Sequence, residues 1–237
     1  TLSALRPAHC QNHGRTLGNL FLSALSEETG EWLMIKTAIT GVMGSGKSTL
    51  SRILREMGYP VFDCDEASRQ LMQPGQPGWQ RCMQTFGEQI CDDQGQLDRS
   101  RLARLVFDDP AARRQLEELT HPLIIEKMME DARRCQGDWW FAEVPLLFEA
   151  GLQSLFDEII TVSAPQPLIL QRLQQGRHIS RQEALRRMAA QMSPQQKEAG
   201  ATLVIVNDGD LEAMRATIRQ WIREKYDAAE SERHLPV

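Results

Sequence analysis

The sequence contains no long apolar run. A helix that crosses a bilayer needs about 18 or more largely apolar residues, and no segment reaches that length. The strongest early stretch, residues 17–25, is interrupted by Gly18, Asn19 and Ser23, and its apolar residues recur at helical spacing without a secretory cleavage site. We therefore expect neither a membrane span nor a membrane partner.

The sequence also contains few cysteines and fewer basic than acidic residues. The 5 cysteines of this 237-residue chain are odd in number and include no C-x-x-C pair, so they indicate reduced thiols and a cytoplasmic protein. Lys and Arg together number 27 against 32 Asp and Glu, for a net charge of -5. This balance argues against a nucleic-acid partner, and any anionic ligand has to be bound by a local group of cations.

Short apolar segments separated by helical patterns begin at residue 35. The segments are residues 35–40, 61–64, 139–144, 158–163 and 202–206, each bounded by turn-forming residues. Such alternation is typical of a parallel sheet that is covered by helices on both faces. The predicted fold class is α/β, with three α/β/α layers around a parallel sheet of about five strands.

The same pattern predicts how the chain is divided. More than 70 residues between the second and third segments carry helical signals and almost no strand signal; Asp109 is expected to cap one of these helices and Pro122 to begin another. Later helices are expected to begin at Ser180, Ser193 and Asp210, and the last of them to end at about residue 226. The predicted parts are an N-terminal extension outside the catalytic fold (1–33), a core (34–66, 137–170 and 199–227), a helical insertion (67–136), a basic helical hairpin (171–198) and a frayed tail (228–237).

Residues 41–48 form a phosphate-binding motif. They read Gly-Val-Met-Gly-Ser-Gly-Lys-Ser, which satisfies G-x-x-x-x-G-K-[ST], with a predicted strand before them and a helix after them. Glycines let the backbone curl so that N–H groups point at phosphate oxygens, and the helix adds its positive end. The core is therefore predicted to be a P-loop NTPase whose nucleotide contacts come from Gly41, Met43, Gly44, Ser45, Gly46, Lys47, Ser48 and Thr49.

Within this motif, Lys47 is expected to bridge the β- and γ-phosphates, and the Ser48 hydroxyl is expected to bind Mg²⁺. Glu143 ends the third apolar segment, Trp-Trp-Phe-Ala-Glu. Two interpretations of Glu143 stay open, a carboxylate on the metal side and a hydrogen-bond acceptor at the end of a strand.

A pair of carboxylates follows the second strand segment. Asp63 and Asp65 flank Cys64, at the edge of a parallel sheet where the phosphate loop also lies. Asp65 is expected to orient or deprotonate an acceptor hydroxyl. Asp63 is expected to cap the next helix or to reach Mg²⁺ through water.

Several short motifs follow in a fixed order. They are Thr40-Gly41 through Thr49, Asp63-Cys64-Asp65 with Arg69, Phe86-Gly87, Leu97-Asp98-Arg99, His121-Pro122-Leu123-Ile124 and Pro145-Leu146-Leu147-Phe148-Glu149. Over about residues 35–208 this series resembles the dephospho-CoA kinase family. The resemblance implies ATP-dependent phosphorylation of the ribose 3′-hydroxyl of dephospho-CoA, giving CoA and ADP. It also implies that the insertion binds CoA and that residues 171–198 form a mobile lid.

The resemblance implies roles for particular residues. Catalytic roles fall to Lys47, Asp65 and Thr40, and contacts with dephospho-CoA fall to Asp65, Arg69, Arg99, His121 and Pro145. The implied cofactors are ATP and Mg²⁺, and the implied assembly is a monomer or a weak homo-oligomer. Where the family usually has a lid arginine this chain has Gly176, and Arg177 is expected to contact ATP instead.

Two further departures keep alternatives open. Val42 stands where the family commonly has a second glycine, and Ala201 stands where it has an acid. One alternative is a nucleotide-binding regulatory paralogue with little turnover. The other is a small-metabolite P-loop kinase of the shikimate or gluconate type.

Overall fold

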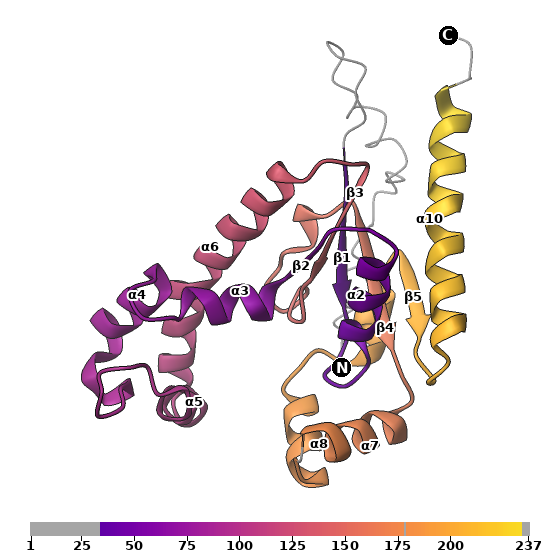
Figure 1. Ribbon diagram of the computed structural model, residues 1–237. Helices are drawn as coiled ribbons and strands as arrows, with labels where there is room; N and C mark the ends of the chain where they lie inside the picture. The colour runs from indigo at the N-terminus through magenta and orange to yellow at the C-terminus, as the bar shows by residue number, and fades with distance from the viewer. Residues whose placement is uncertain (1–33, 178, 234–237) are drawn as a thin grey trace, which may run out of the picture. The chain divides into compact units, whose positions relative to one another are not determined.

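The computed structural model describes residues 34–177 and 179–233 (Figure 1). The expected extension, residues 1–33, and the last four residues of the expected tail lie outside the described residues. The described elements begin with a strand and end with a long helix, and strands alternate with helices as the sequence predicted.

The centre of the fold is a parallel five-stranded sheet with the strand order β2-β3-β1-β4-β5. Its strands are β1 (Ile35–Thr40), β2 (Val61–Asp63), β3 (Trp139–Glu143), β4 (Glu158–Ser163) and β5 (Leu203–Val206). Each lies where an apolar segment predicted it, which confirms the predicted α/β class. β2 ends one residue early because Asp63 caps the helix that begins at Cys64.

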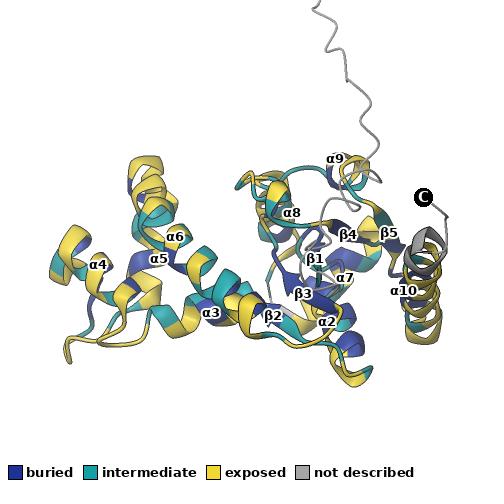
Figure 2. Ribbon diagram, turned by 90° about the horizontal axis from the view of Figure 1, so that it is seen from above, coloured by how far each residue is buried: buried dark blue, intermediate teal, exposed yellow. Residues whose placement is uncertain are grey.

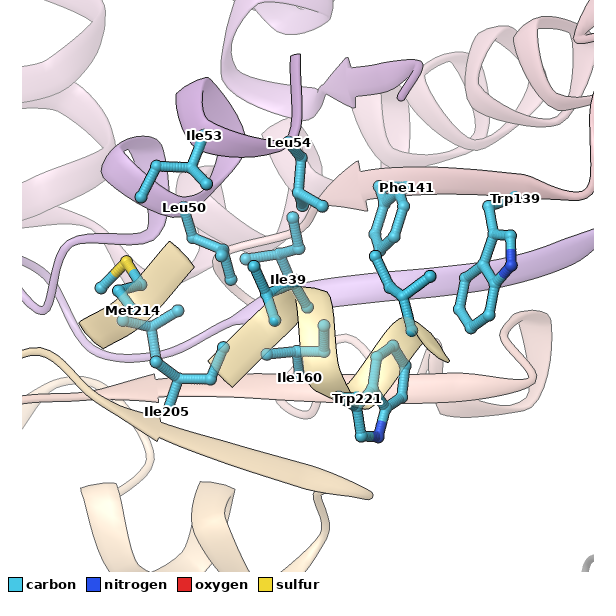
Figure 3. Packing of buried hydrophobic residues seen from close by; sticks show 13 residues of the cluster. Ile39, Leu50, Ile53, Leu54, Trp139, Phe141, Ile160, Ile205, Met214 and Trp221 are labelled. Atoms are coloured by element: carbon cyan, nitrogen blue, oxygen red, sulfur yellow. The ribbon is translucent and has the colours of Figure 1, made fainter. Parts of the chain in front are cut away.

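One face of the sheet packs on α2 (Lys47–Glu56) and α10 (Leu211–Arg233). Side chains alternate along β1, β3 and β4, so every second residue points to this face. Figure 3 shows this core, which joins Ile39, Trp139, Phe141, Ile160 and Ile205 of the strands to Leu50, Ile53 and Leu54 of α2 and to Met214 and Trp221 of α10. The strands are accordingly buried, whereas the outer side of α10 is exposed (Figure 2).

The opposite face of the sheet carries the strand side chains that alternate with those of the core just described. Trp140 stacks on Phe156, with ring centroids 6.3 Å apart, and its indole nitrogen donates to Asp131 of α6 (Pro110–Arg134) at 2.8 Å. Thr161 of β4 donates to the carbonyl of Lys197 in α9 (Pro194–Ala199) at 3.1 Å. Helices therefore lie against both faces, as the three-layer prediction requires.

A helical segment lies between β2 and β3. It consists of α3 (Cys64–Leu71), α4 (Pro77–Phe86), the short 3-10 helix η2 (Gly87–Ile90), α5 (Arg99–Asp108) and α6. Cys82, Phe86, Ile90, Leu102 and Ala112 form a separate buried cluster within it. This cluster shows that the segment has a hydrophobic core of its own beside the sheet.

The prediction that Pro122 begins a helix is wrong. Pro122 lies inside α6, which runs unbroken from Pro110 after the predicted Asp109 cap. Proline has no N–H and leaves the carbonyl four residues earlier without its helical partner. Buried residues on both sides, including Ala112 and Leu123, keep the two halves packed, and this tertiary packing outweighs the local cost.

The remaining helices lie between β3 and β5 in the chain. The 3-10 helix η3 (Gln153–Leu155) leads into β4, and α7 (Gln166–Arg177) and α8 (Arg181–Ala189) follow it as a contacting pair. Ser180 and Ser193 cap α8 and α9 with their hydroxyls, as their sequence positions predicted.

The predicted end of the last helix is wrong. Asp210 caps α10 as expected, but the helix continues through Arg233 instead of fraying near residue 226. The added segment contains alanine, glutamate and arginine, which favour helix, and no glycine or proline. Neither this helix nor any other within the described residues is long and apolar enough to cross a membrane.

Candidate active site

The phosphate loop connects the central strand β1 to α2. Gly41, Gly44 and Gly46 have φ values of 143°, 80° and 105°, a region that favours glycine. A Cβ atom on Gly41 would collide with the carbonyl of Val162, and one on Gly46 would collide with the side-chain amide of Asn207. Both glycines are therefore required by conformation and by close neighbours.

Lys47 and Ser48 open α2 directly after the loop. The ammonium of Lys47 is buried and donates to the carbonyls of Gly41 and Val42, at 3.0 and 3.1 Å. Ser48 is exposed, and the backbone N–H of Thr49 donates to the carbonyl of Gly46. A cation and a hydroxyl thus lie at the positive end of a helix, which is an arrangement suited to phosphate.

Two side chains outside the motif support the loop. The side-chain amide of Asn207 donates to the carbonyl of Ser45 at 2.8 Å, and Arg172 donates to the Asn207 side-chain oxygen at 3.0 Å. Neither was among the predicted contacts. The sequence could have indicated these two residues only through their positions. Asn207 follows β5 and Arg172 belongs to the helix after β4, so both come after strands that end at the edge of the sheet where the loop lies.

Glu143 lies beside the loop at the end of β3. Its carboxylate accepts a 2.7 Å hydrogen bond from the Ser51 hydroxyl of α2, so it does act as a strand-end acceptor. Burial is the main reason that its pKa is raised, and the charges of Asp63 and Asp65 add to this, while Ser51 and Lys47 oppose it. The site therefore holds a carboxylate that is costly to ionise.

The carboxylates after β2 behave differently from each other. Asp63 pairs with Glu143 in the β2–β3 register and accepts from the N–H of Glu66 at 3.0 Å, which makes it a helix cap. Asp65 lies in the first turn of α3 and is exposed. Between them, burial and the neighbouring carboxylates raise the pKa of the Cys64 thiol to about 12.

Thr40 and Pro145 face the interior. Thr40 is fully buried, and its hydroxyl donates to the carbonyl of Pro145 at 3.3 Å. The same carbonyl accepts from the ammonium of Lys197 at 3.0 Å. In this structure the Thr40 hydroxyl therefore holds the end of β1 against the segment after β3, and its catalytic role stays a prediction.

A buried ion pair that the sequence analysis missed lies behind Pro145. The Lys197 side chain is 0% exposed, and its ammonium lies 2.9 Å from Glu149, the last residue of the Pro-Leu-Leu-Phe-Glu motif. Glu149 also accepts from the N–H of Met192 at 2.9 Å. Burial alone would raise the pKa of Glu149, but these hydrogen bonds and the Lys197 charge together lower it.

The helices α7 and α8 contact the phosphate loop. Val42 is buried in a cluster with Ile169, Leu170 and Leu173 of α7 and Ala184 of α8. The side-chain oxygen of Gln191 accepts a hydrogen bond from the N–H of Met43 at 3.0 Å. The residue that departs from the family's glycine is thus part of the packing between loop and helices.

The predicted cations of the insertion have different neighbours. Arg69 is exposed and pairs with Glu66 at 2.8 Å, and Arg99 donates to the Arg69 carbonyl at 3.3 Å. His121 instead lines an open cleft of about 430 Å³ together with Arg114 and Glu149. The side chain of Arg177, the predicted ATP contact, lies outside the described residues.

A phosphate loop after the central strand of a parallel sheet, followed by a helix that begins with lysine and serine, defines a P-loop phosphotransferase core. Comparison with known proteins identifies the family. The family model described as dephospho-CoA kinase matches residues 35–213. The chain belongs to the dephospho-CoA kinase family.

Curated relatives agree with this assignment. A dephospho-CoA kinase of Carboxydothermus hydrogenoformans is 39% identical over 183 residues, covering 76% of this chain and 89% of that protein. One of Moorella thermoacetica is 40% identical over 190 residues, covering 78% of this chain and 90% of that protein. Among solved structures, TT1252 from Thermus thermophilus superposes with a TM-score of 0.73 at 36% identity, covering 81% of this chain and 97% of that one.

The function follows from the family. The chain is an ATP-using kinase with dephospho-CoA kinase activity, and it acts on a small-molecule substrate. Its relatives by sequence do not support the alternative of a shikimate-type kinase, because each of those named above is a dephospho-CoA kinase.

Proposed function

We propose that this kinase transfers the γ-phosphoryl group of MgATP to the ribose 3′-hydroxyl of dephospho-CoA at the carboxyl edge of the sheet. The observation that carries this proposal is the convergence of three strand ends. The phosphate loop follows β1, Glu143 ends β3, and the Asp63-Cys64-Asp65 segment follows β2, in adjacent positions of the sheet. Phosphoryl transfer needs cations, metal-side oxygens and an acceptor-side carboxylate at one place.

At the nucleotide end, the loop from Gly41 to Gly46 would surround the phosphates with Thr49 beside it, and its glycine N–H groups would serve as donors, since the N–H groups of Met43, Ser45 and Thr49 are bound within the protein. Lys47 would leave the carbonyls of Gly41 and Val42 to bind the β- and γ-phosphates, a movement within the reach of its four-carbon stem. Met43, Gly44 and Ser45 shape the wall of this loop. Lys47 then stabilises the charge that develops during transfer.

The residues present fit Mg²⁺. Its preferred ligands are oxygens, and proteins usually bind it jointly with substrate phosphates and water. Ser48 offers an exposed hydroxyl next to the loop. Glu143 of β3 offers a carboxylate that is bonded to Ser51, and Ser51 lies about one helical turn after Ser48 on α2. No group of three His, Cys, Asp or Glu that could hold a metal occurs among the described residues, so the phosphates would complete the site. When bound, Mg²⁺ neutralises charge on the transferring group.

At the acceptor end, Asp65 is the carboxylate that orients the 3′-hydroxyl or accepts its proton. It is exposed in the first turn of α3 and near enough to Cys64 and Glu143 for its charge to raise the pKa of both. Arg69 and Arg99 lie together and suit the anionic diphosphate of the substrate. His121 and Pro145 shape separate walls of the acceptor region.

We propose that the helical insertion binds the CoA portion and that α7 and α8 form the lid, with Arg177 as its ATP contact. The lid is shorter than residues 171–198, because α9 is tied to β4 through Thr161 and to Glu149 through Lys197. The lid is defined below as residues 171–190. Its closure would exclude water from the phosphoryl group.

The proposed setting is the cytoplasm, with the kinase as a monomer or a weak homo-oligomer and without a nucleic-acid partner. Free thiols at Cys64, Cys82, Cys91 and Cys135 suit a reducing compartment. The acidic net charge of -5 suits a small anionic ligand bound at a local basic site better than nucleic acid. Sedimentation at several concentrations tests the assembly.

The deciding experiment is an ADP-release assay with MgATP and dephospho-CoA, adenosine, shikimate or gluconate as acceptor. Turnover restricted to dephospho-CoA supports the proposal. Lys47→Ala should lower kcat by about 10²-fold or more, because it removes charge stabilisation from the transition state. Asp65→Asn should lower kcat with little change in the KM for ATP. Arg52→Gln, an exposed arginine paired on its own helix, is the control.

ATP turnover by Lys47→Ala within a few-fold of the parent would contradict the phosphate assignment. Full kcat in Asp65→Asn would contradict the acceptor assignment without affecting the first. Binding of ATP with no turnover on any acceptor would favour the regulatory paralogue.

A further inference from the structure

A stacked contact joins the helical insertion to the lid. The guanidinium carbon of Arg186, on α8, lies 4.1 Å from the centroid of the Phe107 ring, on α5. Phe107 remains 60% exposed, although large apolar side chains are usually buried. Its ring therefore contributes little to the core of the insertion and is available to the opposite helix.

Arg186 is held in a fixed orientation for this contact. Its guanidinium donates to Glu183 through two nitrogens, at 3.0 and 2.8 Å, one turn earlier on α8. Glu183 also binds Arg187, and its carboxyl pKa is lowered by these hydrogen bonds, so it stays ionised at neutral pH. A guanidinium carbon 4.1 Å from the centroid of an aromatic ring and over its face has the geometry of a cation–π interaction.

The segment directly after α8, which begins a few residues beyond Arg186, is anchored to the core. Gln191 binds the loop N–H of Met43, and the N–H of Met192 binds Glu149, which Lys197 holds in turn. The segment after α8 is thus fixed on both sides of the phosphate site. Movement of the lid would turn about this segment and would make or break the contact between Arg186 and Phe107.

We propose that Phe107 and Arg186 form a latch that holds the lid against the helical insertion during phosphoryl transfer. The proposal rests on the assignment of lid and insertion made above. Exposed cation–π pairs favour the closed state by about two- to fivefold, equivalent to about 0.5–1 kcal/mol. A contact of this strength shifts the lid toward closure and still opens readily for product release.

The latch makes Phe107 and Arg186 positioning residues, because neither touches a reacting atom. Loss of the latch should raise the KM for dephospho-CoA by about two- to fivefold, because a smaller fraction of the enzyme is closed over the acceptor. It should raise the share of ATP lost to water by a similar factor, because an open lid admits water. The kcat should stay unchanged, or should rise if opening of the lid limits turnover.

The test is a double-mutant cycle with Phe107→Leu and Arg186→Gln, alone and combined. Both single variants and the double variant should show the same two- to fivefold changes, since each removes one shared contact. Phe107→Trp keeps an aromatic face and should restore parent behaviour, whereas Arg52→Gln changes an exposed arginine elsewhere and should have no effect. The same cycle in urea unfolding measures the coupling without any substrate.

The following results would overturn the latch or would show that another assignment is wrong. Additive effects in both cycles, or no change in KM and ATP hydrolysis, would overturn the latch. An increase in KM for Phe107→Leu alone would indicate that the ring stacks on the substrate base, which also overturns it. Coupling between Phe107 and Arg186 that is measured in urea unfolding but not in the kinetics would show that their contact plays no part in the reaction. Failure of the phosphate and acceptor assignments would instead appear in the Lys47 and Asp65 variants.

Discussion

The side-chain oxygen of Gln191 accepts a hydrogen bond from the backbone N–H of Met43 at 3.0 Å, although the two residues are 148 positions apart. The contact connects the residue directly after the lid to the middle of the phosphate loop. It fixes both the loop and the point about which the lid moves.

Replacing Gln191 should therefore weaken ATP binding. Gln191→Met keeps the size of the side chain but leaves the Met43 N–H without its acceptor. We expect the KM for ATP to rise about threefold to tenfold, from the loss of about 1 kcal/mol, with a smaller effect on the KM for dephospho-CoA. Steady-state kinetics with each substrate varied in turn measures this.

Gln191→Glu is the matched variant, because it keeps the acceptor oxygen and adds a negative charge beside the phosphates. It should retain stability but lose more kcat/KM for ATP than Gln191→Met. Equal KM values for ATP in the parent and Gln191→Met would show that the hydrogen bond does not support the loop.

Lys197 should be important for stability. Lys197→Met leaves the partly buried Glu149 carboxylate without its cation, and we expect a loss of about 2 kcal/mol in the free energy of unfolding. Urea denaturation measures this loss. Adding Glu149→Gln should recover part of it, and a double variant no more stable than Lys197→Met would argue against the pair.

The same pair predicts a dependence on pH. The folded pKa of Glu149 lies below its ordinary value of 4.5, so its stabilisation is complete above that value and is lost as pH falls through the folded pKa. The urea midpoint of the parent should fall more steeply below pH 4.5 than that of Glu149→Gln. Identical slopes in this acidic range would contradict the lowered pKa.

Glu143 should show a conflict between stability and activity. Burial raises its pKa, so ionisation disfavours the folded state as pH rises above the ordinary carboxyl value. Glu143→Gln keeps an acceptor for Ser51 and removes the buried charge, and it should be at least as stable as the parent at pH 7. Its apparent affinity for Mg²⁺ should fall about 10- to 100-fold if the carboxylate acts on the metal side.

Thermal unfolding and a Mg²⁺ titration of activity test these two effects separately. An unchanged Mg²⁺ dependence would leave Glu143 as a structural acceptor only, which is the other interpretation of the sequence.

Cys64 should be unreactive despite its place in the site. A pKa of about 12 instead of 9.0 lowers the thiolate fraction near pH 8 by about a thousandfold. Iodoacetamide should therefore label Cys64 in the native enzyme far more slowly than in urea, as peptide mass spectrometry would show. Asp65→Asn removes one of the charges that raise the pKa and should speed the labelling; rapid native labelling would contradict the assignment.

Local patterns accounted for most of the elements. The apolar segments placed all five strands of the sheet, and Ser180, Ser193, Asp109 and Asp210 cap helices as predicted. Caps and strand periodicity depend on neighbours within a few residues, which is why the sequence reveals them. Pro122 shows the opposite case, because packing on both halves of α6 outweighed a reliable local rule.

The residues of the site also fall into two groups, those that the sequence revealed and those that only the tertiary structure placed. By itself, the sequence determined the phosphate loop, its glycines, Lys47 and Ser48, because these act within eight consecutive residues. Only the tertiary structure decided that Thr40 faces inward, that Lys197 is buried against Glu149, and that His121 lines a cleft together with Glu149. The latch of Phe107 and Arg186 belongs to this second group. Such contacts join residues far apart in the chain, and they exist only once the sheet and the helices have brought the two segments together.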